Sequence, residues 1–418
     1  MNSFKKDEQI TGKIDWLTVL IYLILVFFGW ATIYSAVYQE DEGNIFSTAI
    51  RSGKQFQWMI ASLIIGFIIL IIDSKFFSTF AYVIYAVMLV ILVGVIFFGV
   101  EVKGQNNWIR FGGFQMQPSE MAKFVTCLTV AKYISTLNVD IRKWKFKWRV
   151  FAIIFLPMLL VLVQGDAGSA IVFTALILAL FREGLESYFL VIGTTVAILS
   201  VLALLIPKFI FSGILLAIAI FLAYYNWRNK TAVKWVLGIW LISSLYIFSV
   251  DFAFSKLKSH QKDRINVLIG KGGNDWNIRQ SMIAIGSGGF AGKGYLNGTQ
   301  TKLKFVPEQS TDFIFSSIGE EFGFIGSAVL VLIFVALFFR LLFMAERQRS
   351  RFSRVYGYCV VSILFFHFLI NIGMAIGVAP VIGIPLPFIS YGGSSLLSFT
   401  ILLFLFIRMD SQRLESFR

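Results

Sequence analysis

Charged residues are scarce in this chain of 418 residues. Asp, Glu, Lys and Arg make up 14% of it, whereas a soluble protein carries about a quarter. Hydrophobic residues make up 57%, and apolar runs longer than ~18 residues recur from end to end. These runs are solidly apolar and do not alternate, which argues against a β-barrel. The composition therefore predicts an all-α fold class, namely a polytopic helical integral membrane protein.

Cysteine and histidine are also rare, with two residues of each. Cys127 and Cys359 both lie inside apolar runs, so no disulfide framework is implied. His260 and His367 have no second His or Cys at metal-ligand spacing, so we predict no zinc site. The first apolar run, residues 16–37, is too long for a signal-peptide core and no small-residue cleavage site follows it. We expect it to remain as a span.

The hydropathy pattern predicts twelve membrane spans. They cover residues 16–37, 56–72, 76–99, 119–134, 150–164, 167–181, 188–206, 209–225, 233–254, 311–343, 355–378 and 391–407. The tenth run is longer than the ~20 residues that one crossing needs, so its first turns either stand clear of the bilayer or tilt strongly. We treat residues 1–418 as a single transmembrane domain with one large loop, at residues 255–310.

Basic residues in short loops orient the spans. Clusters precede the first span and follow the fourth, eighth, tenth and last. Their members are Lys5, Lys6, Lys13, Arg142, Lys143, Lys145, Lys147, Arg149, Arg228, Lys230, Lys234, Arg347, Arg349, Arg351, Arg354, Arg408 and Arg413. With twelve spans, all of these clusters lie on one side, which we predict to be the cytoplasm. Both termini then lie in the cytoplasm, and the large loop lies outside.

The large outer loop is nevertheless strongly basic. Its basic residues are Lys256, Lys258, Lys262, Arg264, Lys271, Arg279, Lys293, Lys302 and Lys304. Long loops are exempt from the orientation rule, so the excess needs another cause. Two explanations stay open. The loop is a solvated face near anionic headgroups, or it binds the pyrophosphate of a lipid-linked substrate, for which Lys and Arg are the natural counter-charge.

A glycine cluster at residues 286–294 resembles a phosphate-binding loop at first sight. A Walker A motif would need Gly at Ser287 and Ser or Thr at Gly294, so we reject nucleotide binding. Two interpretations remain. The backbone N–H groups approach an anion closely, or the glycines form a tight re-entrant turn without a ligand.

Asp312 lies where the large loop enters the tenth span. In one interpretation Ser310 or Thr311 caps the following helix, and Asp312 stabilises its first turn. In the other, Asp312 is a general base that lies within hydrogen-bond reach of a sugar hydroxyl in a partly desolvated pocket. Glu320 and Glu321 lie two turns deeper. Because intramembrane acids are costly, we expect at least one of them to meet a basic or polar partner.

Two further polar stretches precede outer ends of spans. At the fourth span, Ser119 is a candidate N-cap, and Glu120 and Lys123 share a helix face at i, i+3 spacing. This pair is either an intrahelical ion pair or part of the same cavity as Asp312. Between the fifth and sixth spans, we expect Asp166 to cap the next helix.

A Pro/Gly-rich outer segment at residues 379–395 follows the eleventh span. Non-helical backbone at membrane depth is tolerated only where protein or a watery cavity covers it. We therefore assign this segment to the cavity wall.

Four stretches are similar to signature segments of the SEDS family (shape, elongation, division and sporulation). They read NWIRFGGFQMQPSEMAK, QSMIAIGSGGFAGKG, VPEQSTDFIFSSIGEEFGFIG and PVIGIPLPFISYGGSS, and they occur in family order. The GKG, the GTQ near Gln300 and the PEQxTDFIF phrasing are closer to the elongation branch than to the division branch. The family core has ten spans, and the two extra spans lie within residues 188–254. Ser310 stands where the family usually has His, so no role of that His transfers.

The resemblance implies a peptidoglycan glycosyltransferase that polymerises lipid II during cell elongation and releases undecaprenyl pyrophosphate. It makes Asp312 the catalytic base that deprotonates the acceptor hydroxyl. It implies that the substrate-binding residues are Arg110, Glu120, Lys123, Gln280, Ser281, Lys293, Glu308, Ser390 and Ser394. Basic loop residues, with or without a divalent cation at the pyrophosphate, would stabilise the developing charge.

The resemblance also implies the partners and the location. The family works in the bacterial cytoplasmic (inner) membrane with a class B penicillin-binding protein, which is a transpeptidase, and with the elongation machinery. We expect no nucleic acid as a partner. Three alternatives stay open. They are a flippase for the same lipid-linked precursor, the division paralogue, and a scaffold that only recruits the transpeptidase.

Overall fold

The computed structural model describes residues 14–38, 45–102, 105–111, 114–256, 262 and 276–414. The chain divides into two compact units. The first combines Met1–Leu185 with Trp276–Arg418, and the second is Glu186–Asp275. Whether the two behave as one domain stays a prediction.

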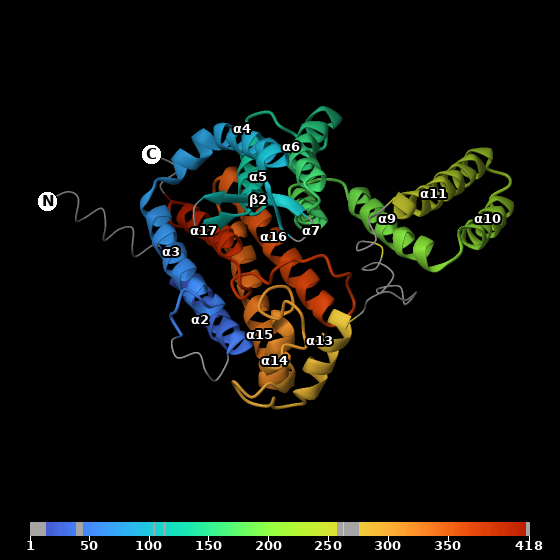
Figure 1. Cartoon of the computed structure of the whole chain (residues 1–418). Helices are drawn as coiled ribbons and strands as arrows, with labels where there is room; N and C mark the ends of the chain where they lie inside the picture. The colour runs from blue at the N-terminus through green and yellow to red at the C-terminus, as the bar shows by residue number, and fades with distance from the viewer. Residues whose placement is uncertain are drawn as a thin grey trace. The chain divides into compact units, whose positions relative to one another are not determined.

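The first unit is a bundle of long helices with one small sheet (Figure 1). Its elements are α2 (Trp16–Val37), α3 (Arg51–Ile71), α4 (Ser74–Phe98), β1 (Val100–Val102), β2 (Gln105–Phe111), β3 (Phe114–Met116), α5 (Pro118–Ser135), α6 (Trp144–Val163), α7 (Ala167–Val172), the 3-10 turn η1 (Phe173–Ala175), α8 (Leu176–Arg182), α13 (Trp276–Ser287), α14 (Thr299–Lys302), α15 (Ile314–Glu346), α16 (Arg351–Ala375) and α17 (Gly393–Ser411). α16 and α17 form the buried centre, because α17 packs on α3 and α5 while α16 packs on α5, α8 and α15.

Ten helices in the described part of the chain are long and apolar enough to cross a membrane. They are α2, α3, α4, α6, α9, α10, α11, α15, α16 and α17. The outer helices expose large apolar side chains such as Phe67, Val90 and Phe97, as lipid-facing surfaces do. The polytopic helical class is therefore confirmed. The other two predicted spans correspond to α5, which is less apolar, and to the interrupted run α7–η1–α8, so the count of twelve stays a prediction.

A three-stranded antiparallel sheet joins α4 to α5, where the sequence predicted only a loop. The register pairs Val100 with Trp108 and Arg110 with Gln115. β2 contacts α4 and α5, and β3 contacts α17, so the sheet lies against the end of the bundle. The strands contain only three, seven and three residues, too few for an alternating hydrophobic pattern to be recognised in the sequence.

The start of α5 differs from the prediction. The helix begins at Pro118, a position that favours proline, and Gln117 is its N-cap. Ser119 therefore lies inside the first turn, and the prediction that it caps the helix is wrong.

A sharp bend divides α15, which accounts for its unusual length of 33 residues. At the bend Gly323 has φ 62° and ψ −158°, a conformation that only glycine adopts readily. In a regular helix each carbonyl accepts a hydrogen bond from the N–H group four residues later. The carbonyls of Glu320 and Glu321 would therefore bond to the N–H groups of residues 324 and 325, but the bend separates them. The glycine-rich loop supplies the missing partners.

Four main-chain hydrogen bonds join the glycine-rich loop to the bend. Lys293 N and Gly294 N donate to the carbonyls of Glu320 and Glu321 at 3.0 and 2.9 Å. In return, the two N–H groups that follow Gly323 donate to the carbonyls of residues 289 and 290 at 2.9 and 3.1 Å. The loop thus replaces the helical bonds that the bend removes, and its N–H groups at 293 and 294 are used within the protein.

The second unit is a group of three antiparallel helices, α9 (Tyr188–Leu205), α10 (Lys208–Tyr225) and α11 (Lys230–Lys256) (Figure 1). A small core forms from Ala203, Phe211 and Ile247. A hydrogen bond of 2.6 Å between Ser200 Oγ and Tyr246 Oη adds a polar contact between α9 and α11. These helices match the three spans predicted within residues 188–254.

Candidate active site

Asp312 lies in a turn just before α15 and is half-buried. The main chain of this turn is fixed from two sides. Asn371 Nδ2, from α16, donates to the Asp312 carbonyl at 2.8 Å. Ser390 Oγ donates to the Thr311 carbonyl at 2.6 Å, and its own hydroxyl accepts from Leu386 N at 2.8 Å. α16 and the segment at residues 379–392 therefore hold in place the backbone that carries the Asp312 carboxylate.

The prediction that Ser310 or Thr311 caps α15 is wrong. The N-cap is Phe313, which has no capping side chain. Thr311 Oγ1 instead donates to the Glu308 carbonyl at 3.2 Å and to Glu308 Oε2 at 3.0 Å. Ser310 Oγ accepts from Arg51 Nη1 at 2.7 Å. Both hydroxyls are thus used to shape the turn around Asp312.

Arg51, the first residue of α3, is a residue that the sequence analysis did not single out. Its Nη1 lies 3.9 Å from Glu308 Oε2, and its guanidinium lies 5.8 Å from the centroid of the Tyr391 ring. Burial raises the pKa of the Tyr391 phenol, although the positive charge of Arg51 acts in the opposite direction. The Arg51 side chain remains 47% exposed, so a cation is available beside the Asp312 turn. The sequence did offer one signal for Arg51, because it lies just before the predicted outer end of the second span, where a basic residue is unusual.

The segment at residues 379–392 lies directly against Asp312. Gly383 has φ 72°, and a Cβ at this position would lie 3.4 Å from Asp312 Oδ2. The carbonyl of Ile384 accepts from the same Asn371 amide, at 2.7 Å, that binds the Asp312 carbonyl. Phe388 has φ 65° and packs edge-on against Tyr22, with ring centroids 5.3 Å apart. Protein therefore covers this non-helical backbone, as the sequence analysis expected.

Glu120 and Lys123 form the ion pair that their spacing predicted, with Lys123 Nζ 2.6 Å from Glu120 Oε1. Both side chains are buried. The ammonium also lies 3.0 Å from His367 Nε2 and over the ring of Phe399. Because an ammonium only donates, His367 Nε2 accepts, and His367 Nδ1 donates to the Pro385 carbonyl at 3.1 Å. His367 therefore links the Glu120–Lys123 pair to the segment at residues 379–392. From the sequence, this histidine was considered only as a metal ligand.

Lys293 is engaged by one of the two deep acids. Its Nζ donates to Glu320 Oε1 at 2.7 Å. Glu320 also accepts hydrogen bonds from Thr299 Oγ1, Gln300 N, Thr301 N and Thr301 Oγ1. The expectation that a deep acid meets a basic partner is thus confirmed. The geometry favours the structural interpretation of the glycine cluster, and substrate binding by Lys293 stays a prediction.

Three predicted substrate-binding serines have partners within the protein. Ser281 Oγ donates to the Ala375 carbonyl at 2.7 Å, and Ser394 Oγ accepts from Gln117 N at 3.1 Å. Ser390 holds the Asp312 turn as described above. These contacts give each hydroxyl a positioning role, and direct contact with a substrate stays a prediction.

The remaining predicted residues stand on separate elements. Arg110 is exposed on β2, where its guanidinium lies 2.7 Å from the side-chain amide of Gln115, its cross-strand neighbour. Gln280 is half-buried on α13. Glu308 lies in the Asp312 turn and has φ 55°, an unusual value for a residue with a side chain. Of the basic loop residues, those at 258, 264 and 271 lie outside the described residues.

Asp166 connects the sheet to the helices. Its Oδ1 accepts from Ser169 N at 2.9 Å, which confirms that it caps α7. Its Oδ2 accepts from Asn107 Nδ2, Gln117 Nε2 and Ser119 Oγ at 2.9, 2.7 and 3.3 Å. Asp166 therefore ties α7 to β2 and to the start of α5, a wider role than local capping.

No group of three or more His, Cys, Asp or Glu within the described ranges is arranged to hold a metal ion. A divalent cation at the pyrophosphate stays a prediction. An apolar cavity of about 430 Å³ lies between α8, α15 and α16, where it is lined by Leu178, Phe338 and Phe365. These residues lie inside the helices, whereas the Asp312 turn precedes the start of α15, so the cavity is separate from that turn.

The long apolar helices, with a polar site at one end of the bundle, define a multi-pass membrane protein. Residues 15–210 and 179–415 match the model of the FtsW/RodA/SpoVE family, described as a cell cycle protein. The chain is 31% identical over 412 residues to the peptidoglycan glycosyltransferase RodA of Treponema pallidum (strain Nichols), covering 91% of this chain and 94% of that protein. It is 31% identical over 407 residues to the peptidoglycan glycosyltransferase MrdB of Escherichia coli (strain K12), covering 95% and 93%. The chain therefore belongs to the FtsW/RodA/SpoVE family of bacterial membrane proteins.

Solved structures support the same fold. The rod shape determining protein RodA of Thermus thermophilus aligns with a TM-score of 0.64 at 22% identity, covering 96% of this chain and 97% of that one. A chain from a peptidoglycan synthase complex, described as coordinating polymerization and crosslinking, aligns with a TM-score of 0.70 at 23% identity, covering 96% and 98%. The SEDS-type bundle expected from the sequence is confirmed.

Proposed function

We propose that this chain is a peptidoglycan glycosyltransferase that polymerises lipid II into glycan strands during cell elongation. The observation that carries the proposal is its 31% identity, along more than nine-tenths of its length, to proteins with that activity in their names. These relatives carry the names RodA and MrdB, which supports the elongation branch over the division paralogue FtsW.

Asp312 is the general base of the proposed reaction. Its carboxylate takes the proton of the acceptor sugar hydroxyl, and the hydroxyl oxygen attacks the anomeric carbon of the donor. The bond from that carbon to the pyrophosphate breaks, and undecaprenyl pyrophosphate leaves with the electron pair. The support is the position of Asp312 in a half-buried turn whose main chain Asn371 and Ser390 hold. A fixed base lowers the cost of reaching the reactive geometry.

Arg51 supplies positive charge in this scheme. It lies beside the Asp312 turn, half-exposed, and a guanidinium binds phosphate oxygens with paired hydrogen bonds. We assign it to the donor pyrophosphate, where it stabilises the charge that develops as the bond breaks. A divalent cation would supply the same kind of stabilisation.

We place the Asp312 turn on the outer face of the cytoplasmic membrane and both termini in the cytoplasm. The support is an ionic cluster at the other end of the bundle, where Arg347 binds both Asp15 and Asp410. α16 alone separates the two ends by about 37 Å, at ~1.5 Å per residue over 25 residues. Basic residues concentrate at the end that carries Arg347, which is typical of a cytoplasmic face.

The partner that we propose is a class B penicillin-binding protein. The support is the likeness of the fold to a chain from a complex that coordinates polymerization with crosslinking. A transpeptidase beside the polymerase would cross-link strands as they form.

The decisive experiment is glycan synthesis from purified lipid II in detergent, by the chain together with its transpeptidase. We expect strands from the wild type and a loss of roughly 100-fold or more in Asp312→Asn, the size of effect typical of a general base. Asp140→Asn is the matched control, because Asp140 is exposed and makes only a local hydrogen bond.

The same assay separates the alternatives. Flipping has no meaning in detergent, so a transporter would make no strands. A scaffold would make none either. If the wild type is inactive with every partner tested, or if Asp312→Asn equals Asp140→Asn, the enzyme proposal is wrong.

A further inference from the structure

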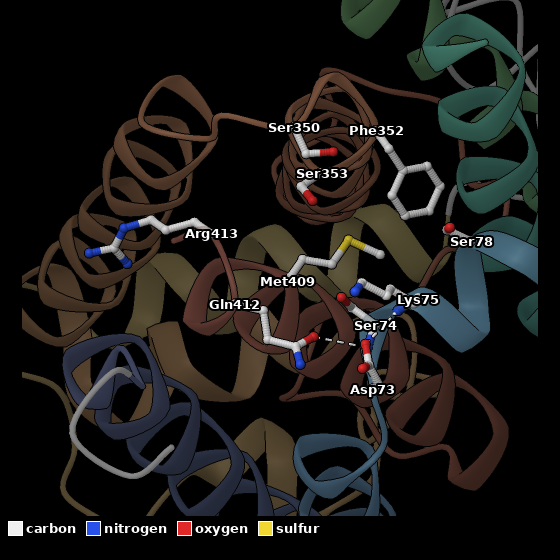
Figure 2. Close-up of a pocket in the computed structure, with 10 residues that line it drawn as sticks. All are labelled: Asp73, Ser74, Lys75, Ser78, Ser350, Phe352, Ser353, Met409, Gln412 and Arg413. Carbon is white, nitrogen blue, oxygen red and sulfur yellow. Dashed lines mark hydrogen bonds between the residues drawn. The ribbon is translucent and has the colours of Figure 1, made fainter. Parts of the chain in front are cut away.

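A polar pocket of about 150 Å³ lies at the end of the bundle opposite Asp312. It forms where α4 and α16 begin and where α17 ends, and Figure 2 shows the side chains that line it. Four of these side chains are serines and two are cations. This composition differs from the apolar surfaces of the surrounding helices.

α16 presents unused hydrogen-bond donors to the pocket. Its N-cap is Ser350, whose side chain makes no capping hydrogen bond. The first N–H groups of a helix carry partial positive charge and are a common anion site. A helix start alone does not define a ligand site, but α16 adds a second feature within its first turn.

Ser353 is that second feature. Its side chain is 8% exposed, lines the pocket, and has no hydrogen-bond partner within the described part of the chain. Figure 2 shows it beside Ser350 on the wall formed by α16. A hydroxyl that lines a cavity, on a residue nine-tenths buried and with no partner among the described residues, is available to a ligand atom that enters the cavity.

Charge in the pocket favours an anion. Two cations, Lys75 and Arg413, and one carboxylate, that of Asp73, line the pocket, and the charge of Arg413 is shared with Asp410. The Asp73 carboxylate already accepts from Lys75 N at 2.9 Å, and Arg413 Nη1 lies 3.1 Å from Asp410 Oδ2, outside the pocket lining. The α4 start offers no free capping site, because Gln412 Oε1 accepts from Ser74 N at 3.0 Å (Figure 2). The anion donors therefore come from the α16 start, the serine hydroxyls and the two cations.

We propose that this pocket binds a phosphate group, supplied by the headgroup of an anionic phospholipid in the membrane that the bundle crosses. The pocket lies where spans end, which is the depth of lipid headgroups, and basic pockets between helices on such a face bind phosphate-bearing lipids. Phe352 and Met409 in the lining offer apolar contact to the glycerol carbons. Free inorganic phosphate presents the same chemistry, so the test separates the two sources.

The test measures lipid retention by native mass spectrometry of the full chain in detergent with phosphatidylglycerol or phosphatidylcholine. We expect the wild type to retain phosphatidylglycerol preferentially. The double variant Lys75→Gln/Arg413→Gln should retain about tenfold less, the loss expected when charge-assisted hydrogen bonds are removed. Ser353→Leu, which fills the pocket, should act in the same direction. The control is Arg228→Gln/Lys230→Gln, which removes two exposed cations from the second unit.

A second arm uses inorganic phosphate and thermal unfolding. If phosphate raises the melting temperature of the wild type but not of the pocket variants, and the lipids are retained equally, the phosphate site stands but the lipid source is wrong. If the pocket variants match the wild type in both arms, the proposal is overturned. Should Ser353→Leu fail to fold, the Lys75→Gln/Arg413→Gln double variant still decides the outcome. Neither arm uses glycan synthesis, so the result is independent of the proposed function.

Discussion

Lys293 is bonded twice to Glu320. Its ammonium donates to Glu320 Oε1 at 2.7 Å, and its backbone N–H donates to the Glu320 carbonyl at 3.0 Å. The second bond exists because the bend at Gly323 leaves that carbonyl without its usual helical donor. Glu320 also holds Thr301, whose carbonyl accepts from Gln309 Nε2 at 2.8 Å, three residues before the candidate base. The pair therefore supports the loop that leads into the active-site turn.

Removing this pair should destabilise the loop. Glu320→Leu leaves a cation and several buried donors unpaired, so we expect a loss of about 3 kcal/mol in unfolding free energy. Lys293→Met should cost less, because a quarter of the Lys293 side chain is exposed. A double-mutant cycle with thermal unfolding measures the coupling, which we expect to exceed roughly 0.5 kcal/mol. Strictly additive effects would contradict the interpretation of the two residues as a pair.

Substituting the glycine at the bend tests the loop–helix exchange. Gly323→Ala forces a side chain into a conformation that costs about 1–3 kcal/mol, and its Cβ would lie 2.3 Å from Gly292 N. We expect a lower melting temperature and slower glycan synthesis. Gly193→Ala in α9 is the matched control, since no atom lies within 4 Å of the added Cβ. That control should be stabilised by roughly 0.5–1 kcal/mol. Equal behaviour of the two variants would show that α15 tolerates a straight geometry.

Arg51 should matter more for activity than for stability. Exposed ion pairs contribute about 0–1 kcal/mol, so Arg51→Gln should barely change the melting temperature. Loss of a phosphate contact should slow glycan synthesis by about tenfold or more. Arg51→Lys keeps the charge without the paired geometry and should be intermediate. Lys54→Gln, also exposed in the first turn of α3, serves as the control, and a rate equal to that control would remove Arg51 from the site.

Asp15 predicts a pH dependence of stability. Burial raises the pKa of this carboxyl, but the hydrogen bonds from Arg340 and Thr18 together lower the pKa by more than burial raises it. The folded pKa therefore lies below the ordinary value of 3.8. The ionised carboxylate therefore stabilises the fold above pH 3.8, and this contribution is lost as pH falls through the lower folded pKa. Asp15→Asn should melt at a lower temperature than the wild type at neutral pH, and the difference should shrink below pH 3.8. A constant difference across this range would contradict the assignment.

Local features of the sequence were predictable, and long-range ones were not. The apolar runs gave the spanning helices, and the i, i+3 spacing gave the Glu120–Lys123 pair. Asp166 was recognised as a cap, because its partner is three residues away. His367 and Arg51 were missed because their partners lie 244 and 259 residues away in the chain.

The bend in α15 was hidden for the same reason. A glycine in an apolar run is usually part of a regular helix, and only the loop bonds reveal the break. The capping prediction failed because Ser310 and Thr311 give their hydroxyls to contacts within the turn and with α3 rather than to the helix. The strands were missed because they are too short to show a clear alternation of apolar and polar residues.

The exchange of main-chain bonds at Gly323 sets a fixed spacing within the loop. The acceptors at residues 289 and 290 and the donors at 293 and 294 must all meet a single bend, so the two residues between them act as a measured spacer. An epitope tag, a fluorophore-labelling sequence or a single-residue deletion placed there would prevent the loop from making its hydrogen bonds to both halves of α15 at once. Engineering of this face should therefore avoid residues 289–294.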